Sequence, residues 1–372
     1  MINRFSPWWH DVPLPSEPDA QALFLSWYTF DESAQCWNKH MPANPDTNSN
    51  DSTRPSDSAG NADTTSSELT LVTWNVDAFG ARPEDRMAAI ISTLQGQGAT
   101  AAAAPDVLFF QEVSRAMLQF LLNDAWIRGR WYSSESGASV TGWPRGQQFT
   151  TATFLSRDRF TNGGCGGGGG GSSSSSIGPI WRTKYPSRFG RDALCCDVFL
   201  PSSSSGRREG TTRVRLVNVH LDSLPIQPSK RPRQVAIVAN MLRGAGRGLV
   251  AGDFNPVLPE DDTLLVDSRL VDVWTALHPG EEGFTWGIDG QQPFPAGRLD
   301  KVGVVGLQAT AIEVLHPGVL PSSRENDEGE TASEEQSEQR KQRDEDEQPL
   351  PWSDHSGLRF SCALVDAQHP QV

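Results

Sequence analysis

The stretch LTLVTWNVD, residues 69–77, is an apolar run that ends in polar residues. Its first part, Leu69-Thr70-Leu71-Val72, has the length and the Leu and Val content of a buried strand. The remainder, Thr73-Trp74-Asn75-Val76-Asp77, brings an amide and a carboxylate to the end of that strand. The stretch therefore predicts a strand whose end carries polar chemistry.

Four further polar clusters follow in chain order. They are Gln111-Glu112 after Val107–Phe110, His220–Ser223 after Val214–Val219, Gly252–Asn255 after Leu249–Ala251, and Ser353–His355. Polar residues at strand ends converge on one rim of a sheet. Packing does not require so many acids there, and clustering them costs repulsion unless a cation is present. Such a rim can bind a metal and a phosphate together.

The candidate metal ligands are oxygen donors. Glu112 is the best direct ligand, because Mg²⁺ keeps several waters and uses only one or two carboxylates. Asn75 and Asp77 lie beside it in the predicted rim, and Asp354 is a further candidate ligand. We expect Mg²⁺ as the cofactor, with Mn²⁺ as the alternative, and we count Asn75 among the catalytic candidates as well.

The remaining candidates suit hydrolysis of a phosphodiester. Asp253 can orient an in-line water as the base, and Asn255, two residues on, would point to the same side of an extended segment. His220 and His355, if protonated, can donate to the developing charge, and Asp300 can hold His355 in the right tautomer.

The helix and strand pattern predicts an α/β fold. Pro83 suits the first turn of a helix, and Met87, Ile90, Ile91 and Leu94 then form one apolar stripe. Further helices are expected at 116–123 and 232–243, and closely spaced strands at 150–155, 193–200 and 213–219. This mixture predicts two packed mixed β-sheets flanked by helices, a four-layer αββα sandwich.

The composition divides the chain into three parts. We expect an aromatic N-terminal arm at 1–39, a disordered linker at 40–68, and a metal-dependent phosphodiesterase domain at 69–372. Flexible insertions are expected at about 163–176, 202–210 and 322–348, since these are rich in Gly and Ser or in charge. The arm either packs on the body or docks a protein partner.

The net charge of −14 lies at the edges of the predicted domain. Residues 1–68 hold ten acids and three bases, and residues 321–350 hold eleven acids and four bases. The rest is balanced, so a local basic patch for nucleic acid is not excluded. The five cysteines show no CxxC spacing, which favours a reducing compartment, and no stretch is long and apolar enough to span a membrane.

The cluster order TWN, QE, HL, GDxN and SDH resembles the endonuclease/exonuclease/phosphatase superfamily of metal-dependent phosphoesterases. Within it the chain is most similar to 5′-tyrosyl-DNA phosphodiesterases of the tyrosyl-DNA phosphodiesterase 2 type. The segments 271–274 (VDVW) and 284–286 (FTW) resemble that family's VDVW and YTW. The resemblance covers about residues 69–320 and 351–365.

The resemblance implies roles for individual residues. Glu112 would bind the metal with Asn75 and Asp77 nearby, and Asp253 and Asn255 would orient water and phosphate. His220 and His355 would contact the scissile phosphate, Ser223 would lie close, and Trp286 would lie by the DNA end. The chain departs from the family at four places: Phe254 within GDxN, Pro256 and Val257 in place of a basic residue, Gln148 or Phe149 in place of a Tyr, and Ser356 in place of a Trp.

The expected activity is Mg²⁺-dependent release of tyrosine from a 5′ DNA phosphate, which would repair trapped topoisomerase adducts in the nucleus, or in nucleus and cytoplasm. Lys230 and Arg231 are candidate DNA contacts, as is the basic cluster at Arg182, Lys184, Arg188 and Arg191. The alternatives are an abasic endonuclease or RNA-end hydrolase of the same superfamily, and an inactive scaffold that binds DNA or protein.

Overall fold

The computed structural model describes residues 22–40, 68–97, 104–137, 147–160, 175–202, 210–290, 292–321 and 350–365. The predicted linker at 40–68 and the predicted insertions near 163–176, 202–210 and 322–348 lie outside the described residues, apart from residues at their ends.

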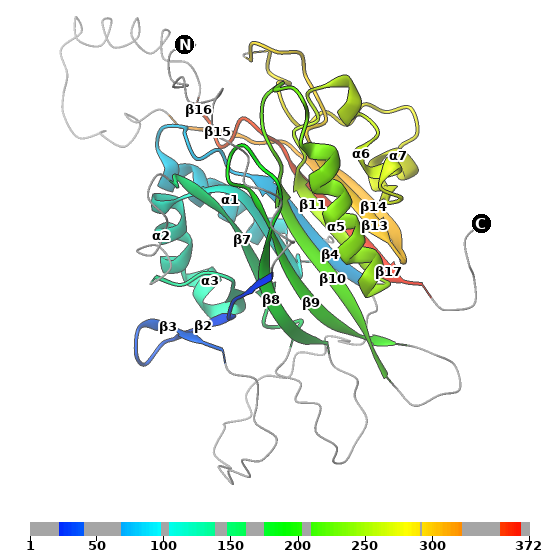
Figure 1. Cartoon of the computed structure of the whole chain (residues 1–372). Helices are drawn as coiled ribbons and strands as arrows, with labels where there is room; N and C mark the ends of the chain where they lie inside the picture. Colours follow the sequence, from blue (N-terminus) through cyan, green and yellow to red (C-terminus); the bar gives the residue numbers. More distant parts are fainter. Residues whose placement is uncertain are drawn as a thin grey trace, which may run out of the picture.

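Two mixed sheets form the centre of the molecule (Figure 1). The first has the strand order β1-β8-β9-β10-β11-β13-β12. Its strands are β1 (Ala22–Phe24), β8 (Ser176–Lys184), β9 (Asp192–Ser202), β10 (Gly210–His220), β11 (Gly248–Asp253), β12 (Val271–Asp272) and β13 (Asp300–Val305). We call it sheet A.

The second sheet, sheet B, has the order β14-β17-β4-β5-β7-β6-β2-β3. Its strands are β2 (Tyr28–Asp31), β3 (Cys36–Lys39), β4 (Glu68–Asn75), β5 (Val107–Ser114), β6 (Trp131–Ser133), β7 (Phe149–Ser156), β14 (Leu307–Leu315) and β17 (Gly357–Leu364). A separate short pair joins β15 (Val319–Leu320) to β16 (Leu350–Pro351).

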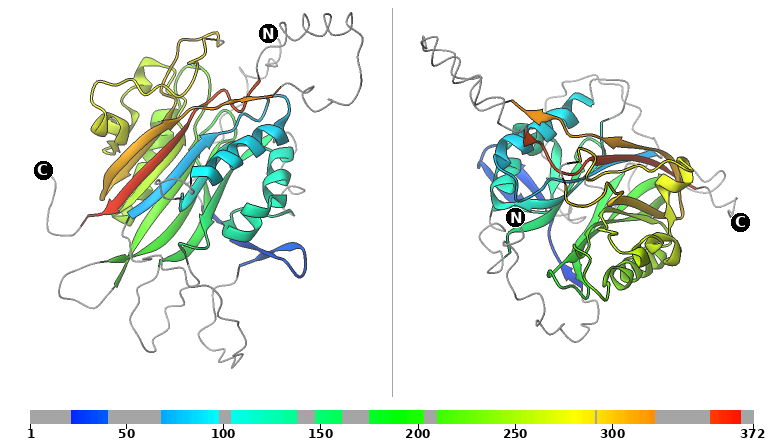
Figure 2. Two further views of the ribbon diagram at one scale, coloured as in Figure 1. Left: turned by 180° about the vertical axis from the view of Figure 1, so that it is seen from behind. Right: turned by 90° about the horizontal axis from the view of Figure 1, so that it is seen from above.

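Most helices lie on the outer faces of the two sheets, as Figure 2 shows from behind and from above. The helix at Val273–Leu277 instead packs against β13 of sheet A and β14 (Leu307–Leu315) of sheet B, and its buried residues join the cluster between the sheets. The helices are α1 (Pro83–Gln97), α2 (Arg115–Asn123), α3 (Ala125–Arg130), α5 (Arg231–Ala245), α6 (Leu264–Asp267), α7 (Val273–Leu277) and the 3-10 helix η3 (Pro259–Asp261). None of the helices in the described part of the chain is long and apolar enough to cross a membrane.

Three apolar clusters hold the layers together. One, which includes Leu71, Phe109 and Leu216, lies between the sheets. A second joins sheet B to α1 and α2, and a third joins sheet A to α5 and α6. The predicted four-layer αββα sandwich is therefore confirmed.

Helix α1 shows how the sequence produces this layering. It begins at Pro83, with Glu84 and Asp85 in the first turn beside the positive end of the helix dipole. The predicted apolar stripe of Met87, Ile90, Ile91 and Leu94 is buried against sheet B. At about 1.5–3 kcal/mol for each buried side chain, this stripe is what fixes the helix to the sheet.

The described part of the N-terminal arm is built into both sheets. Phe24 of β1 pairs with Trp181 of β8 in sheet A, and Tyr28 of β2 pairs with Ser133 of β6 in sheet B. Between them, the Trp27 indole donates to the carbonyl oxygen of Gly178 over 2.9 Å. This part of the arm packs on the body, which is one of the two interpretations of the sequence.

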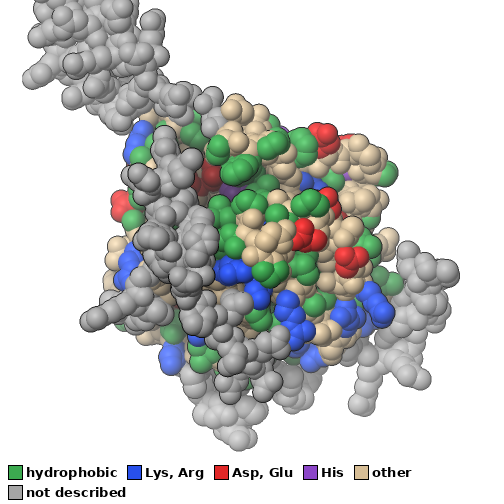
Figure 3. All heavy atoms as spheres, turned by 45° about the horizontal axis from the view of Figure 1, so that its top comes forward, with side chains coloured by type: hydrophobic (Ala, Val, Ile, Leu, Met, Phe, Trp, Pro, Cys, Tyr) green, Lys and Arg blue, Asp and Glu red, His purple; other side chains and the backbone are tan. Residues whose placement is uncertain are grey.

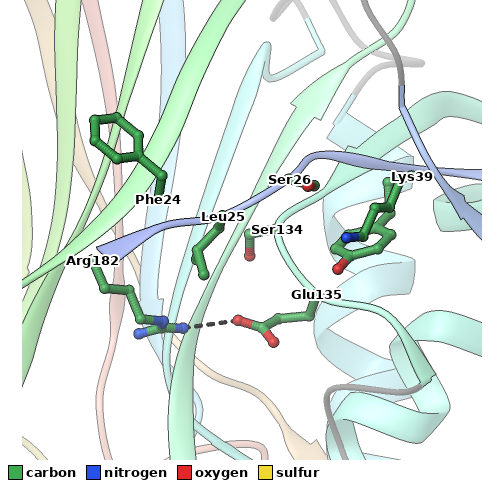
Figure 4. Close-up of a pocket in the computed structure, with 8 residues that line it drawn as sticks. Phe24, Leu25, Ser26, Lys39, Ser134, Glu135 and Arg182 are labelled. Carbon is green, nitrogen blue, oxygen red and sulfur yellow. Dashed lines mark hydrogen bonds and ion pairs between the residues drawn. The ribbon is translucent and has the colours of Figure 1, made fainter. Parts of the chain in front are cut away.

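A polar pocket of about 270 Å³ lies beneath the arm (Figure 4). It is lined by Phe24, Leu25, Ser26, Tyr28, Lys39, Ser134, Glu135 and Arg182. The guanidinium of Arg182 is already paired with Glu135 and with Asp192, each at 2.8 Å. None of the lining residues is among the predicted catalytic or metal-binding residues, although Arg182 belongs to the basic cluster considered for DNA contact.

Candidate active site

The strand ends that carry the polar clusters meet at one end of the two sheets. Within sheet A, His220 of β10 pairs with Asp253 of β11, which also pairs with Asp300 of β13. Within sheet B, Asn75 of β4 pairs with Gln111 of β5. Figure 3 looks onto this end of the molecule and shows a recess with histidine and acidic side chains at its bottom.

The approach of β10 to β11 explains the glycine before Asp253. Gly252 has a φ of 140° and pairs with Val219. An added Cβ at this position would lie 2.0 Å from the carbonyl oxygen of Val219. Only glycine therefore lets the end of β11 lie close enough to place Asp253 beside His220.

Asp253 lies at the centre of the site. Its Oδ2 accepts a hydrogen bond from Asn75 Nδ2 at 3.0 Å, and the Nε2 atoms of His220 and His355 lie 3.5 and 4.0 Å from the same oxygen. Burial raises the pKa of Asp253 to about 7, against the lowering effect of His355. A carboxylate with a pKa near neutrality suits the task of accepting a proton from water.

His355 and Asp300 form a buried pair. Asp300 Oδ2 lies 2.8 Å from His355 Nδ1, the contact expected from the sequence. Burial alone would lower the pKa of His355, but the neighbouring carboxylates, Asp300 first, raise it well above its ordinary value. The raised pKa favours the imidazolium form of His355, whose Nε2 lies 4.0 Å from Asp253 Oδ2.

His220 has the opposite protonation. Arg191 Nη1 lies 2.9 Å from His220 Nδ1, and because a guanidinium can only donate, we assign the proton of the neutral ring to Nε2. Burial, with Arg191 second, lowers the pKa of His220 well below its ordinary value. The lowered pKa favours the neutral ring of His220 over the protonated form that the sequence analysis considered, and the neutral ring still offers an N–H donor.

The Nε2 atom of His220 is buried and has no hydrogen-bond partner among the described residues. Its nearest acceptors are Glu112 Oε1 at 3.6 Å and Asp253 Oδ2 at 3.5 Å. A buried donor without a partner points to a bound group at that position.

Glu112 faces the site from sheet B. Its Oε2 accepts from the Ala78 backbone N–H at 3.2 Å. Burial raises the pKa of Glu112, Arg191 lowers it, and the neighbouring carboxylate of Asp354 raises it again. The backbone is left-handed at Glu112 with φ 56°, and equally at Asp77 (53°) and Asn255 (45°). Such a conformation is uncommon for residues other than glycine and concentrates at functional sites.

Asn75 and Asp77 are close to Glu112 but are engaged with the protein. The Asn75 Oδ1 accepts from the Asp77 N–H at 3.1 Å. Asp77 Oδ2 accepts from Arg86 at 3.0 Å, and its Oδ1 accepts from the N–H groups of Phe79 and Gly80. The structure therefore gives these two residues contacts that orient Asp253 and the loop after β4.

The donor set fits a hard divalent ion that retains water. Burial and then Asp354 raise the pKa of Asp77, and Asp354 also acts on Glu112, so three carboxylates crowd one place. Within the described ranges no three His, Cys, Asp or Glu side chains converge as a closed metal cage. Mg²⁺ does not need one, because it is commonly held by one or two carboxylates. Glu112 and Asp354 are the residues that fit this role.

The remaining predicted residues lie around this centre. Asn255 donates its backbone N–H to Asp253 Oδ1 at 2.9 Å. Ser223 accepts from Arg191 Nη2 at 3.2 Å. The indole of Trp286 donates to Asp354 Oδ2 at 3.1 Å, which places Trp286 at the edge of the site.

The assignment of Arg231 to DNA binding needs correction. Arg231 is buried, and its Nε donates to Asp261 Oδ2 at 2.8 Å while Nη1 donates to the carbonyl of Asp222 at 2.6 Å. Its guanidinium ties α5 to the loops around η3 and cannot contact a phosphate. Lys230, the residue before α5, is half-buried.

Sequence reasoning missed the roles of Arg191 and Phe149. The sequence places Arg191 in a basic cluster of candidate DNA contacts, yet its guanidinium binds both His220 and Ser223. Phe149 stacks on the His220 ring at 5.7 Å, and the Arg191 guanidinium lies 4.6 Å from the Phe149 ring centroid. The position of Arg191 in the sequence could have indicated its proximity to His220, because Arg191 directly precedes β9 and β9 pairs with the strand that carries His220.

Residues 72–355 match the model of the Endonuclease/Exonuclease/phosphatase family. The chain therefore belongs to this family, whose fold is that of phosphodiesterases and nucleases. Among solved structures, the chain is similar to humanized D. rerio TDP2 carrying 14 mutations, with 20% identity over 80% of this chain and 99% of that chain and a TM-score of 0.53. It is also similar to D. rerio TDP2 complexed with single strand DNA product, with 19% identity over 79% of this chain and 98% of that chain and a TM-score of 0.52. At these identities the likeness shows the shared fold. A comparison with curated proteins gave no significant match.

Proposed function

We propose that this chain is a Mg²⁺-dependent phosphodiesterase that hydrolyses a 5′-phosphotyrosyl bond at a DNA end, releases tyrosine and leaves a 5′ phosphate. The observation that carries the proposal is the arrangement around Asp253. Two imidazole nitrogens, from His220 of sheet A and His355 of the segment before β17, lie within 4.0 Å of one carboxylate oxygen. This is a base flanked by two donors, as hydrolysis of a phosphodiester requires.

Asp253 would orient the attacking water and accept its proton. Asn75 Nδ2 and the Asn255 N–H hold its two oxygens, so the carboxylate is fixed in direction. Because burial raises its pKa to about 7, it is ionised in mildly alkaline solution and still basic enough to accept a proton.

The two histidines would bind the equatorial oxygens of the scissile phosphate. His355, held as an imidazolium by Asp300, contributes a positive charge, and His220 contributes a neutral N–H donor. Arg191 adds a second positive charge behind His220. Donors fixed before the reaction stabilise charge without reorganisation, which is why buried ones are effective.

A bound Mg²⁺, held by Glu112 with Asp354 nearby, would supply Lewis-acid polarisation of a phosphoryl oxygen.

The choice of a tyrosyl leaving group rests on its chemistry and on the fold likeness. A phenol has a pKa near 10, so it departs as phenolate with less need for protonation than a sugar alkoxide. The described site offers no obvious further acid for an alkoxide. The D. rerio TDP2 structure that shares the fold contains a single strand DNA product, and Lys and Arg side chains gather on the lower part of the face in Figure 3. Action on DNA adducts would imply a nuclear, or nuclear and cytoplasmic, location.

A panel of end-labelled substrates tests the proposal. We expect the purified chain to release tyrosine from 5′-phosphotyrosyl DNA in Mg²⁺ or Mn²⁺, and to act far more slowly on 3′-phosphotyrosyl, abasic and RNA ends. Abasic cleavage equal to or faster than 5′-tyrosine release would replace this substrate with the abasic alternative while leaving the hydrolytic site in place. Binding of DNA without cleavage of any member would favour the inactive scaffold.

A further inference from the structure

The strand that carries Glu112 is interrupted directly at the active site. β5 pairs with β7 in register as far as Phe110↔Ala152 and again from Val113↔Thr150. Two residues of β5 therefore face a single residue of β7, which is a β-bulge. The second bulged residue is Glu112, whose φ of 56° is left-handed.

The bulge turns two consecutive side chains toward the same sheet. In a regular strand, neighbouring side chains point to opposite faces. Here Gln111 Nε2 donates to Asn218 Oδ1 of sheet A at 2.8 Å, and the next residue, Glu112, places Oε1 3.6 Å from His220 Nε2 of the same sheet. Without the bulge, Gln111 and Glu112 could not both face β10.

Asn218 closes this bulge from the opposite sheet. Its Nδ2 donates to the carbonyl oxygens of Phe110 at 3.3 Å and Ala152 at 3.0 Å, the last regular pair before the interruption. Gln111 Nε2 also donates to Thr73 Oγ1 of β4 at 2.9 Å. Both amide side chains are fully buried, so no water competes for these hydrogen bonds.

Asn218 also lies two residues before His220 on β10, so the two side chains share one face of that strand. A fixed Asn218 thus fixes the position of His220 relative to β5. The pair of amides links the two halves of the candidate site, Glu112 from sheet B and His220 from sheet A.

We propose that Asn218 and Gln111 are positioning residues. Together they hold the β5 bulge closed and set the spacing between Glu112 and His220, so that Glu112 is preformed as a ligand for a divalent cation. The inference rests on the proposed function, because Glu112 is the metal ligand only there. The amides act through Glu112 and contact neither metal nor substrate.

Two substitutions test this role. Asn218→Leu and Gln111→Met keep the approximate volume and remove the inter-sheet hydrogen bonds. Leu216→Ala is the matched control, because Leu216 is buried between the sheets on the same face of β10, two residues before Asn218, and its side chain makes no hydrogen bond. Each variant is studied by Mg²⁺ titration calorimetry, thermal unfolding and hydrogen exchange of the Ala78 amide, which donates to Glu112 Oε2.

We expect the two amide variants to bind Mg²⁺ about 10–100-fold more weakly, as is typical when a residue supporting a metal ligand is lost. The Ala78 amide should also lose protection in metal-free protein. Leu216→Ala should lower the melting temperature and leave both readouts near the wild type.

Unchanged Mg²⁺ affinity and Ala78 protection in both amide variants would overturn the proposal. So would an equal loss of Mg²⁺ affinity in Leu216→Ala at a similar melting temperature. If Asn218→Leu does not fold, Gln111→Met decides alone, because it leaves the Asn218 contacts to the Phe110 and Ala152 carbonyls in place. If the wild type itself binds no Mg²⁺, the proposed function fails separately, and the Ala78 amide of the metal-free variants decides whether the amides position Glu112.

Discussion

Replacing Asp253 with Asn should stabilise the metal-free protein while removing its activity. Burial raises the pKa of Asp253 from its ordinary 3.8 to about 7. The pKa in the folded state is therefore above that of the unfolded chain. As the pH rises from 3.8, the unfolded chain releases this proton first, so stability falls until the folded carboxyl ionises near pH 7. At 1.36 kcal/mol for each pKa unit, the ionised carboxylate costs roughly 4 kcal/mol above pH 7.

The Asn side chain introduces an opposing cost. Asp253 Oδ1 accepts from the Asn255 N–H and Oδ2 accepts from Asn75 Nδ2. A carboxamide has one acceptor oxygen, so one of these buried donors loses its partner at about 1–3 kcal/mol. Above pH 7, the variant should therefore be more stable than the wild type by roughly 1–3 kcal/mol. At pH 5, where most of the carboxylate penalty is absent, the gain should vanish or reverse.

Urea unfolding in EDTA at pH 5 and pH 8 measures this difference. The stability of Asp253→Asn relative to wild type should rise by about 3 kcal/mol between the two pH values, since most of the carboxylate penalty develops in that interval. Turnover in Mg²⁺ should fall by about 10² or more, whereas Asp197→Asn, at a buried carboxylate paired with Arg215 outside the site, should retain turnover. A relative stability that does not depend on pH would refute the reasoning.

Three further substitutions separate metal binding, stability and DNA contact. Glu112→Gln should weaken Mg²⁺ binding, measured by calorimetric titration, and leave the fold intact. Unchanged Mg²⁺ affinity and unchanged activity would show that Glu112 is not the ligand. Arg231→Met removes the buried guanidinium that pairs with Asp261, so it should lower the free energy of unfolding in urea by about 3–5 kcal/mol. If the variant is instead folded and as stable as the wild type but binds DNA more weakly, Arg231 is a DNA contact. Trp286→Ala should weaken the binding of a DNA end by about 1–3 kcal/mol if a base stacks on the indole. Fluorescence anisotropy with a labelled DNA end measures this affinity, and an unchanged affinity would mean that Trp286 only supports Asp354.

The sequence predicted the layers and the convergence of the polar clusters because both depend on local patterns. The apolar run before Asn75 and the stripe from Met87 to Leu94 each follow the period of their element, and both are buried as that period requires. The run before Asp253 lies within β11, and Asp253 is the last residue of that strand. Strand ends share an edge in any sheet of this kind, so His220 and Asp253 could be expected to meet.

Side-chain direction and protonation could not be predicted in the same way. Arg231 lies in a basic run that looks exposed, but its partner Asp261 is thirty residues away and only the fold brings them together. The neutral state of His220 depends on Arg191, which approaches from the segment before β9. The left-handed backbone at Glu112 has no local signal such as glycine, because tertiary contacts impose it.

The position of β4 has a consequence for how the protein is made. This strand lies between β5 and β17, so one of its neighbours is residues 107–114 and the other is residues 357–364. During synthesis, the edge of β4 that pairs with β17 stays open until almost the whole domain has left the ribosome. An unpaired edge is open to association with other chains, and pairings between distant segments form slowly. Because His355 lies two residues before β17, a nascent chain holds no complete candidate site before that last pairing forms, and the proposed hydrolytic activity would start only when the sheet is closed.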